Sequence, residues 1–173
     1  VQALTRFYRL TLGQKELFGT IDDEITHVTL YMQLQNMRYN HCADFIADIP
    51  PELGSLTIPK LTFQPIVENA LLHGILMKEE KKGCILLTGW REGEDAVLVI
   101  SDDGAGIAPE KLDTLLDSLS ADNGLTSLRH IGVSNTNLRL KSLYGDAYGL
   151  SFTSTPGQGT EVTVRIPARP VSL

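Results

Sequence analysis

The chain has 173 residues, of which 42% are apolar, and its formal net charge at pH 7 is -6. This length and composition are typical of one globular domain with a full core and room for a small appendage. The acidic balance argues against a nucleic-acid-binding protein, which needs a basic patch, and no apolar run approaches the roughly 20 residues of a membrane span. The chain starts at Val1 without a signal peptide. We therefore expect a cytoplasmic fragment of a longer protein, attached to the membrane only through a missing N-terminal part.

The first part of the chain, Gln2 to Asn40, is predicted to form helices with a break between Gly13 and Gly19. Thr20, followed by Asp23 three residues later, is typical of a capped helix start. The apolar residues after this cap fall on one helical face: Ile21, Ile25, Val28 and Met32. These helices are too few for a bundle of their own. We expect them to pack on another copy of the chain or on the domain that follows.

A short strand is predicted for Cys42–Ile49, and the proline-rich stretch Pro51–Pro59 is predicted to be a loop. A helix follows from about Pro65, a residue suited to the first turn, to Gly74. Its apolar residues form one stripe at helical spacing: Ile66, Val67, Ala70, Leu71 and Ile75. The rest of the fold is expected to be organised around this helix.

The polar side of the same helix carries Asn69 and His73, four residues apart, with Glu68 on a neighbouring edge. A helix with only a structural role needs an apolar stripe and long charged residues facing water. An amide, an imidazole and a carboxylate within two turns instead indicate a binding site, although an ordinary polar face is the simpler interpretation of this segment alone.

Two strands are predicted next, Cys84–Trp90 and Ala96–Ser101, joined by a polar turn. The second strand is almost continuously apolar, which is typical of a strand covered on both faces. After a glycine-rich turn, a helix is predicted for Pro109–Leu119, and the polar segment Ser120–His130 is predicted to be a mobile lid.

The C-terminal part is predicted to contain a helix from Gly132 to about Tyr144, with Leu138, Leu140 and Leu143 facing inward. A hairpin of Leu150–Ser154 and Thr160–Ile166 follows. Strands that pair antiparallel at one end and take helical insertions at the other predict an α+β fold. We expect a two-layer sandwich with a mixed sheet and helices on one face.

Asp102 follows the apolar strand and is succeeded by Gly104 and Gly106. A carboxylate here accepts a hydrogen bond from the amino group of adenine, whereas guanine presents a carbonyl oxygen that repels it. The glycines let the backbone come close to the base. This pattern indicates ATP over GTP, and the alternative is a plain Asp-Gly turn after a strand.

Phosphate binding is expected at the start of the last helix, where Gly132 and Asn135 lie near free backbone N–H groups and the positive end of the helix dipole. An ordinary helix start is the alternative. Asn69 offers a neutral oxygen to Mg²⁺, and Glu68 is placed to orient or deprotonate an attacking group. His73 either contacts phosphate or orders the helix end. Thr160 either bonds Asp102 or a water near adenine, or belongs only to a hairpin turn.

The order of these segments resembles the ATP-binding domain shared by sensor histidine kinases, gyrase, MutL-type repair proteins and heat-shock chaperones, known as the GHKL or Bergerat fold. The resemblance rests on the segments 68–74, 102–106 and 131–135 and on the Gly-Gln-Gly-Thr ending at Thr160. More narrowly, Gln64 to Asn69 with the preceding Ile58-Pro59 is similar to sensor histidine kinases of the LytS/YesM type. Tyr31 to Tyr39 resembles the second helix of their dimerisation hairpin.

The resemblance implies a site for ATP and Mg²⁺ in which Asn69 holds the metal, Asp102 binds adenine, and the segment from Gly132 through Val133 to Asn135 lines the phosphates. Residues 1–41 would then be a partial dimerisation and phosphotransfer region, and residues 42–173 the catalytic domain. A homodimer and a response regulator are the implied partners. One departure is His130, which stands where many relatives carry a glycine.

The second departure is that the phosphoacceptor histidine of the family is missing, so we expect this fragment to bind nucleotide without phosphorylating itself. Two other functions remain open. One is an ATPase clamp such as a chaperone or repair protein, although a clamp needs a further transducer domain. The other is a degenerate module that binds nucleotide and partners without transferring phosphate.

Overall fold

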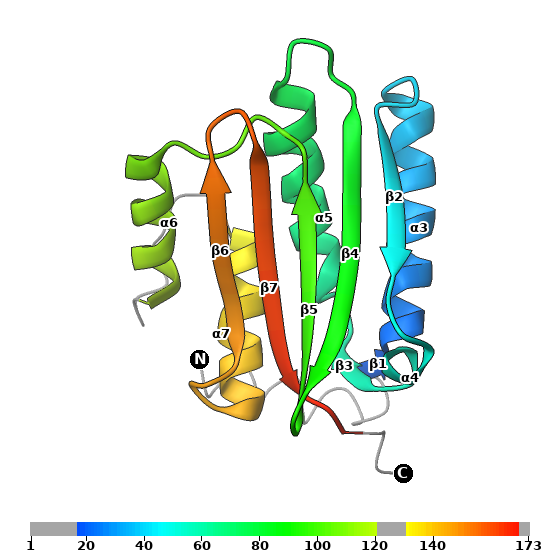
Figure 1. The fold of residues 1–173 in the computed structure, drawn as a ribbon, viewed down its shortest axis with the longest axis vertical. Coiled ribbons are helices and arrows are strands. Elements are labelled where there is room, and N and C mark those ends of the chain that lie inside the picture. The colour runs from blue at the N-terminus through cyan, green and yellow to red at the C-terminus, as the bar shows by residue number, and fades with distance from the viewer. Residues whose placement is uncertain (1–16, 121–130, 170–173) are drawn as a thin grey trace.

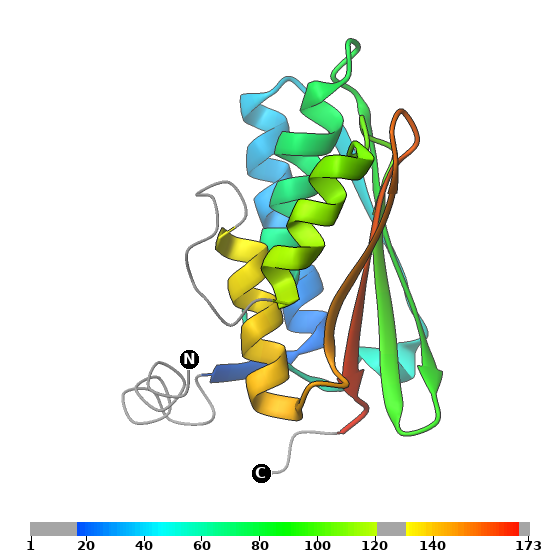
Figure 2. The same cartoon turned by 90° about the vertical axis from the view of Figure 1, so that its left-hand side faces the viewer.

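A five-stranded mixed sheet carries helices on one face (Figures 1 and 2). This computed structural model describes residues 17–120 and 131–169. Across the sheet the strands follow the order β2 (Ala43–Asp48), β4 (Gly83–Glu92), β5 (Asp95–Asp102), β7 (Gly159–Pro167) and β6 (Gly149–Thr155). β2 pairs with β4 in parallel, and the other three pairs are antiparallel. The predicted α+β sandwich with a mixed sheet is confirmed.

The side chains of the central strand β5 alternate between the face covered by helices and the open face. Ala96, Leu98 and Ile100 are buried under the helices. The prediction that β5 is covered on both faces is wrong for the described part of the chain, because the helices lie on one side of the sheet (Figure 2). Val97 is nevertheless buried on the open face, where its neighbours across the strands are Trp90 and Arg165. Large cross-strand side chains thus shield an apolar residue without a second helix layer.

The helix layer is formed by α3 (Ile21–Arg38), α5 (Phe63–Asn69), α6 (Pro109–Ser120) and α7 (Ile131–Tyr144). The predicted cap of α3 is confirmed, because the backbone N–H of Thr20 donates to the Asp23 carboxylate at 2.9 Å and that of Asp23 donates to the Thr20 hydroxyl at 3.1 Å. The buried apolar residues of α3 join the core of the domain that follows: Ile21, Val28 and Met32. The division into residues 1–41 and 42–173 stays a prediction, and residues 1–16 lie outside the described part.

The segment predicted as a loop contains a single helical turn, α4 (Pro51–Gly54), and a short strand, β3 (Thr57–Pro59), which pairs with β1 (Phe18–Thr20). Both were missed because prolines and a glycine dominate so short a stretch. The pairing matters because it ties the start of α3 to the chain just before α5.

The central helix is longer than predicted at both ends. α5 begins at Phe63, and beyond Asn69 the chain continues through a π-helical turn, η1 (Ala70–Gly74), and a 3₁₀ turn, η2 (Ile75–Met77). The predicted apolar stripe is confirmed, because all five of its residues are buried: Ile66, Val67, Ala70, Leu71 and Ile75. Gly74 does not end the helical segment, because the buried Ile75 extends the stripe by another turn.

Helix α7 faces the core with Leu140 and Asn137, whereas Leu138 and Leu143 are only half-buried, which corrects the predicted inward face. The Asn137 side chain donates to the carbonyl of Leu119 at 3.2 Å and accepts from the N–H of Leu150 at 2.8 Å. This amide thereby joins α6, α7 and β6. The predicted lid falls almost entirely on residues 121–130, which lie outside the described part.

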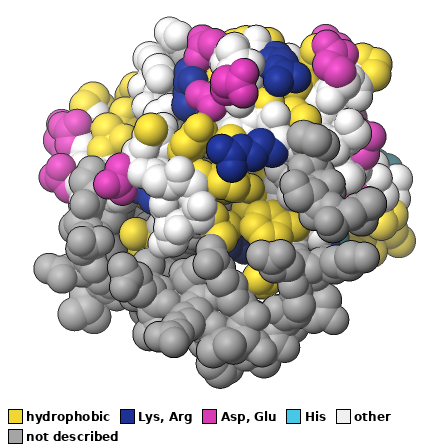
Figure 3. Space-filling view, turned by 90° about the horizontal axis from the view of Figure 1, so that it is seen from below, with side chains coloured by type: hydrophobic (Ala, Val, Ile, Leu, Met, Phe, Trp, Pro, Cys, Tyr) yellow, Lys and Arg dark blue, Asp and Glu magenta, His cyan; other side chains and the backbone are white. Residues whose placement is uncertain are grey.

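The described surface is mixed in character. Seen from the end where β4 turns into β5, acidic, basic and apolar side chains are interspersed on the part of this face that is not grey (Figure 3). Among the described residues, none of the helices has the length and apolar content needed to cross a membrane.

Candidate functional site

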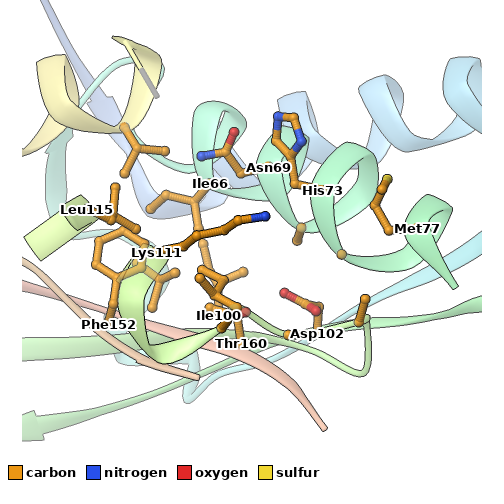
Figure 4. A pocket seen from close by; sticks show the side chains of 18 of the residues that line it. Ile66, Asn69, His73, Met77, Ile100, Asp102, Lys111, Leu115, Phe152 and Thr160 are labelled. Carbon is orange, nitrogen blue, oxygen red and sulfur yellow. The ribbon is translucent and has the colours of Figure 1, made fainter. Parts of the chain in front are cut away.

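A cavity of about 430 Å³ lies between the helix layer and the sheet, at the end where β5 stops (Figure 4). Its walls are mainly apolar, and its polar lining side chains come from α5, η1, β5, α6 and β7: Asn69, His73, Asp102, Lys111 and Thr160. A cavity of this size with few, convergent polar groups is suited to a small molecule with one flat apolar part.

Helix α5 is held in place by a side chain far away in the sequence. Glu24 of α3, which is only 4% exposed, accepts hydrogen bonds from the backbone N–H groups of Leu61, Thr62 and Phe63 at 2.7, 2.8 and 3.0 Å. The N–H groups of Thr62 and Phe63 are donors that the start of a helix leaves unpaired, and the carboxylate also suits the positive end of the helix dipole. Because no side chain of the local sequence caps α5, Glu24 positions the helix that carries Asn69 and His73.

Asp102 is the carboxylate at the floor of the cavity. Desolvation by burial raises its pKa from 3.8 to about 6, although hydrogen bonds from the backbone of Gly104 and Thr160 act in the opposite direction. The N–H of Gly104 donates to the carboxylate at 2.8 Å. Most Asp102 side chains are therefore ionised at pH 7, and the carboxylate can accept a hydrogen bond from a ligand.

The loop after Asp102 is packed so tightly that two positions require glycine. A Cβ added at Gly104 would lie 2.4 Å from the carbonyl carbon of Gly74. Gly106 has a φ of +69°, and its Cβ would lie 2.1 Å from the carbonyl oxygen of Thr155. The end of η1 and the loop directly after β5 therefore touch through their backbones, and the N–H of Ala105 donates to the Gly74 carbonyl at 3.1 Å.

Comparison with known proteins identifies this arrangement. The sequence pattern of the family described as "Histidine kinase-, DNA gyrase B-, and HSP90-like ATPase" matches residues 57–170, which include every residue that lines the cavity. The chain belongs to this family. The predicted relation to the GHKL ATP-binding domain is thereby confirmed, and the cavity lies within the segment that matches the family.

Individual relatives agree with this assignment. Sensor histidine kinase BtsS of Escherichia coli K12 is 32% identical over 98% of this chain, and sensor protein LytS of Streptococcus mutans is 34% identical over 95% of it. The chain spans 27% of the length of each of these two proteins. The catalytic domain of histidine kinase ThkA superimposes with a TM-score of 0.65 over 88% of this chain and 97% of that domain, and at 13% identity it shows a shared fold. The predicted similarity to LytS-type sensor kinases is confirmed.

The structure of this histidine kinase-, gyrase- and HSP90-like domain brings most of the predicted site residues together. Six of the predicted residues line the cavity, and Gly104 lies directly behind the Asp102 carboxylate: Asn69, His73, Asp102, Gly106, Val133 and Thr160. The Thr160 hydroxyl bonds the Ser154 hydroxyl at 2.9 Å, so Thr160 reaches Asp102 through its backbone.

Besides Gly104, three predicted residues lie outside the cavity lining. Glu68 lies toward α3, where its charge contributes after burial to raising the pKa of Tyr31 to about 12. Gly132 and Asn135 are exposed at the start of α7. A Cβ at Gly132 would lie 3.3 Å from the Pro65 side chain, so this glycine also permits the close approach of α7 to α5. The proposed roles of these three residues stay predictions.

Lys111 is a polar residue of the cavity lining that sequence analysis missed. Lys111 and Leu115 lie on the face of α6 that lines the cavity, and Ala108, directly before α6, continues this face at helical spacing. The sequence did contain a signal for Lys111, because this lysine shares a helical face with two apolar residues. On an ordinary surface helix, a lysine lies on the face opposite the apolar residues.

The residues of the site fit a magnesium ion that is held mainly by a bound nucleotide. Among the described residues, no group of three or more His, Cys, Asp and Glu side chains is placed to hold a metal. Asn69 offers one neutral amide oxygen at the cavity wall. Mg²⁺ commonly takes one or two protein oxygens and completes its shell with phosphate oxygens and water, so this sparse donor set suits it.

Proposed function

We propose that this chain is the ATP-binding catalytic domain of a sensor histidine kinase. One observation carries the proposal, namely the ionised, half-buried carboxylate of Asp102 at the floor of an apolar cavity that Asn69 also lines. The family assignment and the sensor kinases among the relatives support it. The activity of the whole protein belongs to the proposal, because the chain spans about a quarter of those relatives.

Asp102 accepts a hydrogen bond from the exocyclic amino group of adenine, and the apolar walls cover the base. Asn69 contributes an oxygen to Mg²⁺, which when bound supplies charge neutralisation for the phosphates. His73 and the segment Gly132, Val133 and Asn135 at the start of α7 contact the phosphate chain, where free N–H groups favour anions. Thr160 orders the adenine end through its backbone.

The γ-phosphoryl group is then transferred to a histidine of the dimerisation hairpin of the full-length protein. The bond from the γ-phosphorus to the bridging oxygen breaks, a phosphorus–nitrogen bond to the imidazole forms, ADP leaves, and Glu68 takes the imidazole proton. A response-regulator aspartate receives the phosphoryl group next. A structural neighbour, histidine kinase ThkA, was solved in complex with the response regulator TrrA, which supports a partner of this class.

The full-length protein is proposed to be a homodimer attached to the membrane outside this chain. Besides its buried face, α3 carries a second apolar stripe at positions 30, 34 and 37. Leu30 is 56% exposed, Leu34 65% and Met37 80%. Exposed apolar side chains one helical turn apart are typical of a helix that packs against another helix.

The first test measures nucleotide binding by calorimetry with MgATP, MgGTP and ATP without metal. We expect ATP but not GTP to bind, and we expect Asn69→Ala to weaken MgATP binding at least tenfold while leaving metal-free ATP nearly unchanged. Gln33→Ala, an exposed amide on α3, is the matched control. Equal binding of GTP, or no heat with any nucleotide, contradicts the proposal.

A second measurement separates kinase, clamp and binding module. The chain is mixed with MgATP and a separate peptide that carries the upstream helix with its histidine. Acid-labile phosphate on the peptide that disappears with Asn69→Ala supports the kinase. Steady hydrolysis with nucleotide-driven dimer closure indicates a clamp, and tight binding without any transfer indicates a module that only binds.

A further inference from the structure

We propose that Lys111 of α6 binds the phosphate chain of the nucleotide and supplies the positive charge that the other described walls of the cavity lack. This inference rests on the proposed function and deepens it. Lys111 lines the cavity from the side opposite α5. Figure 4 shows its side chain extending into the cavity, with the amino nitrogen on the side where α5 and η1 carry Asn69 and His73.

The charge balance of the cavity favours such a group in addition to the proposed magnesium ion. ATP carries several negative charges, the chain has a formal net charge of -6, and Asp102 adds a carboxylate to the cavity itself. Within the described lining, Lys111 is the one Lys or Arg side chain. A point charge on a flexible stem is well suited to phosphate oxygens, which it can follow as the ligand settles.

Other cations near the cavity are engaged elsewhere. The amino group of Lys78 lies 3.7 Å from the carboxylate of Asp103. The guanidinium of Arg139 donates to the carbonyl of Leu61 at 3.1 Å, where it helps to hold the chain before α5. Among the described residues, no ion pair involves Lys111. Its amino group can therefore bind a ligand without first breaking a salt bridge.

The position of Lys111 is fixed by the rest of α6. Ala108 and Leu115 lie on the same helical face and form part of the apolar wall, and Asn137 holds the end of α6 through the carbonyl of Leu119. The start of α6 follows the loop that Gly106 turns, so the helix is anchored at both ends. The backbone of Lys111 is accordingly held in position beside two apolar residues of the cavity wall. Only its four-carbon side chain loses conformational freedom when a ligand binds.

The experiment compares ATP, ADP and adenosine as ligands of the wild-type chain, Lys111→Gln, Lys111→Glu and the control Lys82→Gln. Lys82 is exposed in the turn before β4, so its substitution changes the net charge equally without changing the cavity lining. We expect Lys111→Gln to weaken ATP binding about tenfold and Lys111→Glu more, with adenosine affinity and the control unchanged. The wild-type affinity for ATP should also fall more steeply with salt than that of Lys111→Gln.

The outcomes separate this inference from the proposed function. If the wild-type chain binds no adenine nucleotide, the proposed function fails. If it binds ATP and Lys111→Gln binds equally well, Lys111 has no phosphate-binding role and the function stands. If adenosine and ATP lose affinity equally, the residue acts on the sugar or on packing, which also overturns the inference. Circular dichroism of each variant checks that the fold is retained.

Discussion

At the scale of single residues, the ionised carboxylate of Asp102, the proposed adenine acceptor, lowers the stability of the folded protein. Desolvation raises its pKa to about 6, so the folded protein holds this proton at pH values where the unfolded chain, with a pKa of 3.8, has released it. Below about pH 4 both states are protonated and the cost is absent. Stability then falls as the pH rises through about 6, and the full cost is present above that pH.

Asp102→Asn should therefore stabilise the ligand-free protein at pH 8, by about 2–3 kcal/mol for a pKa shift of this size, while abolishing the preference for adenine. The gain should shrink toward zero near pH 4. Urea unfolding at pH 4, 6 and 8 measures it, with the exposed Asp48→Asn on β2 as the control. An unchanged stability difference across this pH range would show that Asp102 does not titrate as described.

Asp102 also makes adenine affinity depend on pH. Adenosine affinity should fall about tenfold per pH unit below pH 6, because ligand binding competes with protonation of the carboxylate. Asp102→Asn should be flat over the same range, and calorimetry with adenosine at pH 5, 6 and 7 tests both. A profile shared by wild type and variant would place the titration in the ligand or elsewhere in the protein.

At the scale of elements, α5 depends on α3 through one buried carboxylate. Glu24 pairs three backbone donors at the start of α5, and neither a local cap nor a neighbouring side chain replaces it. The two elements are joined a second time by the pairing of β1 with β3. A displacement of α3 would therefore move the helix that carries Asn69, the proposed magnesium ligand.

Glu24→Ala should destabilise the protein by about 3 kcal/mol, because two buried N–H groups and one part-buried N–H group lose their acceptor. Glu24→Gln keeps one acceptor oxygen and should cost less. Chemical denaturation measures both, and Glu94→Ala, an exposed carboxylate in the turn between β4 and β5, should change stability by less than about 0.5 kcal/mol. If Glu24→Ala is as stable as this control, the carboxylate does not hold α5.

At the scale of the whole molecule, the exposed apolar stripe of α3 is the surface through which two copies are proposed to meet. Leu34→Ser combined with Met37→Ser should reduce self-association of the chain by at least tenfold without changing nucleotide affinity, because both side chains are exposed and far from the cavity lining. Sedimentation equilibrium over a range of concentrations measures the dimer, with Thr29→Ser on the same helix as the control. A wild-type chain that stays monomeric at every concentration would contradict the proposed role of this face.

Sequence patterns predicted those parts of the molecule in which local periodicity and burial agree. The stripe from Ile66 to Ile75, the hairpin of β6 and β7 and the cap at Thr20 are all of this kind. Asp102 and Asn69 were recognisable because their motifs are continuous in sequence. The hydrogen bonds of Glu24 to residues 61–63 could not be recognised in the sequence, because they join positions 37 to 39 residues apart. Lys111 was missed because its role depends on which face of α6 meets the cavity.

The backbone contact between Gly74 and Gly104 has a consequence for how ligands are chosen. The proposed base acceptor Asp102 and the proposed metal ligand Asn69 lie on two segments whose backbones meet at these glycines, so neither segment can retreat to admit a longer molecule. Any adjustment to ligand length has to come from the opposite wall. The affinity of inhibitors that bridge both ends of the cavity should thus depend sharply on their length. Substitutions that confer resistance to such inhibitors should occur mainly on α6.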